Sequence, residues 1–458
     1  MLGLVLGLAG TKAQEAAVPA PVVPGLVSIA PVAPGLDPAK KAAEAFDAYR
    51  SGRISEAREL AWSLAEKGDA DALFLLGLIT EASDGRGSKG ASRQQSMDLF
   101  YRKSDEGGNR EAGLRRAMVA LAAARENERV EAKRKFEEIA TGADAASCRL
   151  LGEAWLAGLM DGSRNSGKAT EYWKKAADLG DVDILVPLGS LLLADDEKEG
   201  IAWLEKAASR NRLDAYLAMG THFEDTRKDV DSARRYYREG AEKGHAGCMS
   251  AFSILLSKGG ESEEGAKWLR AAADAGNPKA CSILGKKLFD GSGDARKDGY
   301  RYLLRAAKNG VWQAQSEVGV ILLEGKLGEK DPVAAMAWLT KAMNSGDPET
   351  LYQLAMLHEK GLAGPINYSN VGILLSLASR GGHADASWRV ARMAYEGYRM
   401  KNITDGWAYA AMGAKQGSCK AKALLAEIDK NISASEKGEA EKKYQQLIEG
   451  SEKAVTGN

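Results

Sequence analysis

Four cysteines and four histidines are the side chains of this chain that are best suited to covalent or metal chemistry. A thiolate beside an imidazole can act as a nucleophile, and a cluster of both types can hold zinc. No two cysteines have CxxC spacing and none is flanked by histidine at metal-binding spacing; the cysteines are Cys148, Cys248, Cys281 and Cys419. We therefore expect them to be buried as small apolar side chains.

The histidines do not suggest a catalytic site either. His245 and His383 each follow a glycine that ends a predicted helix, a loop position that Asp and Asn occupy elsewhere in the chain. His222 and His358 are isolated, and neither belongs to an HExxH motif or a triad. The chain also lacks a Walker-type GxxxxGK and a GxSxG motif. We expect no catalytic residue and no cofactor.

One segment, DGSGDARKDG at 290–299, imitates the start of a calcium loop. Ala295 stands where the sharp turn of such a loop needs glycine, and Arg301 replaces the acidic bidentate ligand. A connection between two helices explains these residues better, so no metal is expected.

The glycines show which elements must position these side chains. The chain has 51 Gly and only 11 Pro in 458 residues, and one phrase recurs in it, for example AEKGDADALFLLG at 65–77 and AAKNGVWQAQSEVG at 306–319. We number each copy from its first glycine, called position zero. Position zero occurs eleven times, at Gly68, Gly108, Gly142, Gly180, Asn211, Gly244, Gly276, Gly310, Gly346, Gly382 and Gly417.

Two further positions recur in most copies. Position +9 is tiny, as in Gly77, Gly220 and Gly319, and position −8 is aromatic, as in Phe100, Tyr172, Trp203, Tyr236, Trp268, Tyr302, Trp338 and Tyr409. A glycine within a helix is unfavourable by about 1 kcal/mol relative to alanine, so it indicates close approach of a neighbouring helix. We expect the aromatic residue at −8 to pack against the small residue at +9.

Position zero has the features of a helix end. Glycine there adopts the left-handed conformation that closes a helix, and the next residue is usually a helix N-cap type such as Asp69, Asn109 or Ser418. Each copy is thus a pair of antiparallel helices, which are too short to be stable alone and must stack on their neighbours. The predicted fold is all-α: a right-handed α-solenoid of about eleven antiparallel helix pairs, a TPR-like superhelix.

The pattern resembles the Sel1-like repeat, a relative of the tetratricopeptide repeat. The residues that carry the resemblance are the helix-final AxxxG, the LG at +8 and +9, and the aromatic residue followed by an alanine pair. It covers about 42–428, is strongest over 171–346 and is weaker in the second and third copies. It implies a scaffold or adaptor for protein complexes, often in bacterial envelopes or secretion routes.

Some secreted members of that family carry a disulfide in each repeat, and this chain departs from them. Cys248 and Cys281 fall on facing helices of neighbouring copies, so a disulfide between them is allowed if the protein is exported.

The N-terminus differs from the repeats. Residues 1–13 resemble a truncated signal peptide that lacks a basic start, and 14–38 form a Pro/Ala-rich linker. The repeats follow over 42–428, and 429–458 predict a charged capping helix with a frayed tail. We expect an exported protein, periplasmic or secreted, with no membrane span in the mature chain; it is cytoplasmic if the first segment is not a signal.

The chain has 63 basic and 63 acidic residues, which argues against nucleic acid as a partner. In related superhelices the first helix of each pair lines the concave groove, which places positions +7 and +10 there. The predicted contact residues for protein or peptide partners are Lys286, Glu317, Gln353, Arg389 and Arg392, with Trp388 and Tyr395 as exposed aromatic anchors. An ordinary solvated face is the alternative interpretation.

The leading functional hypothesis is a non-enzymatic scaffold that binds proteins along this groove, in the bacterial cell envelope. The alternatives are a secreted cell-wall or lactam-acting enzyme and an envelope protein that handles a polysaccharide. The polysaccharide hypothesis needs exposed tryptophans, yet Trp203, Trp268 and Trp338 occupy the predicted packing position.

Overall fold

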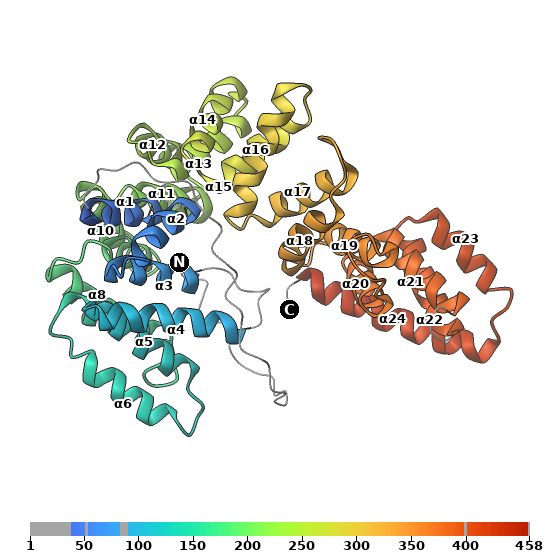
Figure 1. The fold of residues 1–458 in the computed structure, drawn as a ribbon, viewed down its shortest axis with the longest axis horizontal. Helices are drawn as coiled ribbons and strands as arrows, with labels where there is room; N and C mark the ends of the chain where they lie inside the picture. The colour runs from blue at the N-terminus through green and yellow to red at the C-terminus, as the bar shows by residue number, and fades with distance from the viewer. Residues whose placement is uncertain (1–37, 51–53, 83–89, 398–400, 457–458) are drawn as a thin grey trace. The chain divides into compact units, whose positions relative to one another are not determined.

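The computed structural model describes residues 38–50, 54–82, 90–397 and 401–456. Every regular element within these ranges is helical, as Figure 1 shows. The signal segment predicted for 1–13 and nearly all of the linker predicted for 14–38 lie outside the described residues, which begin with the first helix at Pro38.

The chain divides into two compact units, Met1–Ala280 and Cys281–Asn458. The boundary falls inside α15. The helices of the first unit are α1 (Pro38–Arg50), α2 (Ile54–Ala65), α3 (Ala70–Ala82), α4 (Gly90–Glu106), α5 (Arg110–Ala123), α6 (Arg129–Ile139), α7 (Ala145–Leu156), α8 (Ser166–Asp178), α9 (Leu185–Leu192), α10 (Glu197–Ser209), α11 (Asp214–Thr221), the π-helix η1 (His222–Arg227), α12 (Val230–Glu242), α13 (Ala246–Lys258) and α14 (Ser262–Asp274).

The second unit continues the same alternation. Its helices are α15 (Pro278–Phe289), α16 (Asp294–Lys308), α17 (Trp312–Glu324), α18 (Pro332–Ala342), the 3₁₀ turn η2 (Met343–Ser345), α19 (Pro348–Lys360), α20 (Tyr368–Arg380), α21 (Ala384–Glu396), α22 (Ile403–Lys415), α23 (Cys419–Ile428) and α24 (Ala434–Thr456).

Consecutive helices pack in pairs, from α1 with α2 to α21 with α22, which confirms the predicted all-α fold of about eleven helix pairs. We call the first, odd-numbered helix of each pair the A helix and the second the B helix. The final helix α24 departs from this scheme, since it packs along α22 and reaches α20. Its side chains hold α22 through Lys443, whose Nζ lies 2.7 Å from Asp405 Oδ1.

The ends of the helices follow the predicted chemistry. Position zero has a left-handed backbone in every copy, including the one without glycine, where Asn211 has a φ of 62°. In most copies the residue after it then caps the next helix: the Asn109 side chain accepts a hydrogen bond from the Ala112 backbone N–H at 3.1 Å. His245 and His383 do the same for Cys248 and Ala386, which confirms their structural role.

The contact at position +9 differs from our expectation by one residue. A Cβ added to Gly220 at +9 would lie 2.4 Å from the Tyr237 ring. One added to Gly152, which stands one place late in its copy and takes the part of the +9 residue there, would lie 2.2 Å from the Trp173 ring. Trp173 and Tyr237 occupy position −7 of their copies rather than −8. Because one residue turns a helix by about 100°, only one of two successive side chains can face the partner helix of the pair.

The aromatic residues at −8 pack elsewhere. Trp203 is half-buried against a core that joins Trp173 of the preceding pair to Leu188 of its own pair. Trp268 lies in the same way against Tyr237 of the preceding pair and Phe252 of its own. The B helix therefore uses position −7 within its own pair and position −8 at the junction between its own pair and the pair before it.

This arrangement makes the steric requirement at +9 testable. Gly152→Ala places a methyl group against Trp173, which is 3% exposed and donates a hydrogen bond to the Arg149 carbonyl oxygen at 3.1 Å. We expect a loss of about 1–3 kcal/mol in the free energy of unfolding, measured from the urea midpoint by circular dichroism. The matched control is Gly167→Ala on the exposed first turn of α8, where an added Cβ has only the Asn165 side chain nearby, at 3.6 Å. Equal effects of the two substitutions would contradict the packing at +9.

Candidate partner-binding surface

The cysteines have the environment of structural residues. Cys148, Cys248 and Cys281 are buried, as expected, but Cys419 is exposed at the start of α23, which corrects our expectation for that residue. Cys419 is the first residue of its helix, so no preceding helical turn can cover its short side chain. Cys248 and Cys281 are not joined in a disulfide in this structure.

One cysteine does lie beside a histidine. The Cys248 Sγ atom lies 3.2 Å from Nδ1 of His245. Burial raises the pKa of the Cys248 thiol to about 12 and lowers the pKa of His245. A neutral thiol beside a neutral imidazole that caps a helix is a poor nucleophile. The residues that the structure describes include no group of three or more His, Cys, Asp or Glu side chains that could hold a metal ion.

The imitation calcium loop proves to be largely helical. Asp294 begins α16, so the acidic and basic residues from 294 onward lie on the first turns of this helix rather than in a loop. Gly299 faces α15, where an added Cβ would lie 2.4 Å from the Phe289 backbone nitrogen.

The predicted contact residues lie on the A helices of the second unit. Lys286 on α15 and Glu317 on α17 form an ion pair of 3.8 Å between neighbouring A helices. Gln353 on α19 instead bonds within its own helix, donating to Glu349 Oε1 at 2.6 Å. These three residues therefore do not converge on one site.

The residues on α21 form the denser cluster. Arg389 donates to the Tyr352 hydroxyl at 3.2 Å and to Glu359 Oε2 at 2.7 Å, so it ties α21 to α19. Arg392 donates from Nε to Glu396 of its own helix at 3.2 Å. Tyr352 and Glu359 were not predicted from the sequence as neighbours of Arg389. Glu359 could have been found from its position in the repeat, because Glu81 occupies the same position, +13, in the first copy.

Trp388 is the centre of this cluster. The cationic groups of Arg389, Arg392 and Lys420 lie 5.7, 5.3 and 4.9 Å from the centre of its ring system. Lys420 comes from α23, one pair further along, and was not predicted. We call Trp388, Arg389, Arg392 and Lys420 the Trp388 cluster.

Trp388 and Tyr395 are half-buried rather than exposed, which corrects our expectation. Both pack against the core of the last pairs, and the Tyr395 hydroxyl accepts a hydrogen bond from Asn431 at 3.1 Å. Contacts from α23 and from the turn after it reach both rings, through Lys420 at Trp388 and Asn431 at Tyr395.

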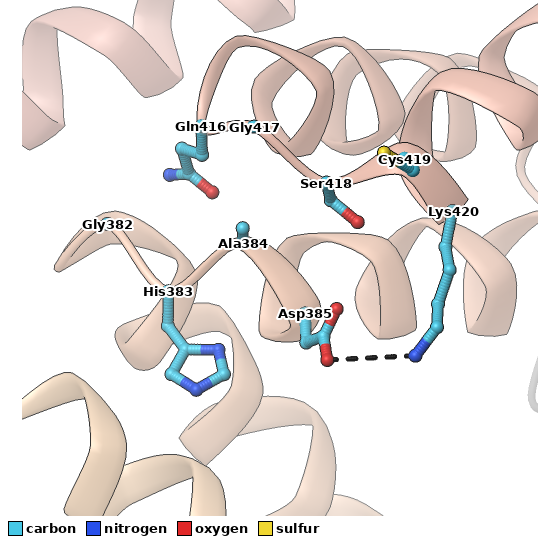
Figure 2. A pocket seen from close by; sticks show the side chains of 9 residues that line it. All are labelled: Gly382, His383, Ala384, Asp385, Gln416, Gly417, Ser418, Cys419 and Lys420. Carbon is cyan, nitrogen blue, oxygen red and sulfur yellow. Dashed lines mark ion pairs between the residues drawn. The ribbon is translucent and has the colours of Figure 1, made fainter.

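An open hollow adjoins the cluster between the first turns of α21 and α23. Figure 2 shows His383 and Asp385 on one side and residues 416–420 on the other. Asp385 lies 3.7 Å from the Lys420 Nζ, and His383 contacts Glu349 of α19 through Nε2 at 3.1 Å. The rim of the hollow thus presents ion-paired side chains at the surface.

The A helices of the first unit use position +7 differently. Arg115 and Arg149 occupy it, and their side chains are only 12% and 16% exposed. Burial alone would lower the pKa of Arg115, but the carboxylates of Glu153 and Glu81 outweigh it and raise this pKa. Each arginine lies between two carboxylates: Glu81 and Glu153 for Arg115, Glu111 and Asp181 for Arg149.

The helix pairs correspond to a known repeat. The Sel1 repeat model matches at seven places, 145–181, 189–211, 214–245, 261–277, 278–311, 312–347 and 348–383. This chain is a Sel1-like repeat protein. The matched repeats begin after the second copy, where the sequence pattern was already weak.

Two solved structures are similar to this chain, and the first of them supports the Sel1-like fold. The crystal structure of a protective antigen of uropathogenic Escherichia coli with an SLR fold has a TM-score of 0.51 at 19% identity, covering 91% of this chain and 95% of that chain. A Sel1 repeat protein from Oxalobacter formigenes has a TM-score of 0.43 at 20% identity, covering 68% of this chain and 93% of that one.

One curated relative also matches part of this chain. It is the alginate biosynthesis protein AlgK of Azotobacter vinelandii, 26% identical over 125 residues. The match spans 27% of this chain and 27% of that protein. A Sel1-like solenoid is a scaffold-type fold that implies protein partners. Among the described helices, none has the length and apolar character needed to cross a membrane.

The cysteine environments give a direct test. Iodoacetamide at pH 8 should alkylate the native protein once per chain, at exposed Cys419, because the other thiols are buried and burial raises the pKa of Cys148 and Cys248. Intact mass measures the number of labels, and Cys419→Ser should reduce it to zero. Rapid labelling of Cys248 in the native protein would show that its thiol is reactive after all.

Proposed function

We propose that this Sel1-like repeat protein is a non-enzymatic scaffold that binds protein or peptide partners through the A-helix face of α19, α21 and α23. The Trp388 cluster carries the proposal. Three cationic groups surround one half-buried tryptophan, an arrangement typical of interface anchors. It fits a partner segment that offers carboxylates beside an apolar side chain.

The ion pairs of the cluster are of a kind that a partner can exchange. Arg392 and Lys420 have side chains that are 43% and 61% exposed, and each has one carboxylate partner. Such exposed pairs contribute about 0–1 kcal/mol. A partner carboxylate can therefore replace Glu396 or Asp385 at little cost, while apolar contact with Trp388 supplies the favourable term.

The Cys248–His245 contact gives little support to the enzyme alternative. Its thiol is buried with a pKa raised to about 12. The scaffold proposal needs no reacting group, and Sel1-like repeats typically serve as non-catalytic scaffolds.

We further propose that the protein acts in the bacterial envelope after export. The apolar start of the sequence and the similarity to an alginate biosynthesis protein both support this location. The same similarity favours a second candidate function, handling of a polysaccharide. Alginate is a polyanion, and the cations of the Trp388 cluster could bind its carboxylates.

Affinity capture from a native envelope fraction tests the scaffold proposal. The variant Arg392→Glu/Lys420→Glu reverses two exposed cations of the cluster and leaves Arg389 in place. We expect recovery of the specific partner to fall at least about tenfold, because partner carboxylates would then face like charges.

The matched control is Lys297→Glu/Arg301→Glu on α16, which reverses two cations that are 75% and 80% exposed in the same unit. It should retain the partner. Equal recovery with both variants would remove the Trp388 cluster from the binding surface. Titration of alginate oligosaccharides at low salt tests the second candidate: binding that the cluster variant abolishes and the control keeps would favour it.

A further inference from the structure

One face of α20 carries large apolar side chains that the described residues of the second unit leave substantially exposed. Ile373 is 60% exposed and Leu377 is 45% exposed, one helical turn apart. Leu362 and Ile366, in the segment that leads into α20, are 46% and 51% exposed. We call Gly372, Ile373, Ser376 and Leu377, which share one side of the helix, the α20 face.

The same segment carries no charge. Residues 361–379 include no Asp, Glu, Lys, Arg or His, although charged residues make up 28% of the chain. The nearest charges are Lys360 and Arg380, immediately outside this stretch. An ordinary solvated helix face would carry charged side chains, so exposure to water is a poor explanation for this one.

Gly372 adds an independent observation. It lies within α20, where glycine is a poor helix former, yet a Cβ added there would meet no atom within 4 Å. Gly319 of the same unit shows the contrast, since its Cβ would lie 2.6 Å from the Leu339 side chain. The described part of the chain thus supplies no neighbour that requires a small residue at 372. Close approach of a helix from another polypeptide would require one.

We propose that the α20 face pairs with the α20 face of a second copy of this chain. A two-fold interface brings each residue close to its own symmetry mate, so any charge near the axis would meet a like charge. A charge-free face with a small residue beside two aliphatic ones satisfies this condition. A lipid surface also accepts exposed aliphatic side chains, but it does not require glycine.

The dimer is expected to be weak. One helix face with its leading segment is smaller than the 1,200–2,000 Å² that stable interfaces typically bury, so we expect a dissociation constant on the order of 10 µM. Sedimentation equilibrium of the full chain from 1 to 200 µM should show a shift from monomer to dimer. Leu377→Glu places like charges across the axis and should abolish the shift.

The matched control is Val333→Glu on α18, where Val333 is 66% exposed in the same unit. It introduces the same charge on a different helix, and its dimerisation should equal that of the wild type. Circular dichroism shows whether each variant is folded. If Leu377→Glu does not fold, Ile373→Cys in a Cys419→Ser background replaces it. This variant should form an intermolecular disulfide, and Val333→Cys should not.

The substitution Gly372→Ala distinguishes a dimer interface at the α20 face from a face that is simply exposed to water. In a Leu377→Glu background, where the chain is monomeric, the alanine should raise the melting temperature by about 2 °C, because it favours the helix and meets no neighbour. In the wild-type background it should weaken dimerisation at least fivefold.

A wild-type chain that stays monomeric to 200 µM would overturn the proposal. Monomeric protein that floats with anionic phosphatidylglycerol vesicles, and loses this binding on Leu377→Glu, would overturn it in favour of a lipid surface. Equal dimerisation of Gly372→Ala and wild type would also overturn it, since the face would then not require close helix approach.

Discussion

The contact between position +9 of each A helix and position −7 of its B helix is the constraint on which the rest of this fold depends. Beside it, at Gly189 and at Gly200, which lies one helical turn before position −7, the two helices meet nearly backbone against backbone: a Cβ on either glycine would lie 2.9 Å from the carbonyl oxygen of the other. Two helices this close can pack in only one rotation about their own axes, because turning either helix would drive a side chain into the backbone of the other. The remaining positions follow from that rotation.

Position −8, one step around the B helix, then lies at the junction with the preceding pair, and Trp203 and Trp268 pack there. On the A helix, position +7 points toward neighbouring A helices. The same register accounts for two ion pairs in different units: Arg115 with Glu81 and Arg389 with Glu359 both join position +7 to position +13 of the preceding copy. The electrostatics of the A-helix face are thus arranged by the contact between the two helices of each pair.

The sequence was sufficient to predict the number of helix pairs, their ends and the caps, because these depend on local backbone preferences such as the left-handed conformation at Asn211. It was insufficient to assign positions −7 and −8. Both are often large and apolar, and only the angle between packed helices distinguishes them. Lys420 was missed for a related reason, since its approach to Trp388 depends on the spacing between α21 and α23, and the half-burial of Trp388 depends on it too.

The two units show how one register can serve stability in one place and the proposed partner binding in another. Arg115 is nearly enclosed between two carboxylates, and removing one partner of such a pair costs about 3–5 kcal/mol because a buried charge loses its counterion. No external ligand readily compensates for that loss, so its ion pairs are fixed. Arg392 is 43% exposed with one carboxylate on its own helix, and a pair of that kind contributes about 0–1 kcal/mol. The difference in burial, more than the presence of arginine on an A helix, determines where this scaffold can exchange an internal carboxylate for that of a partner.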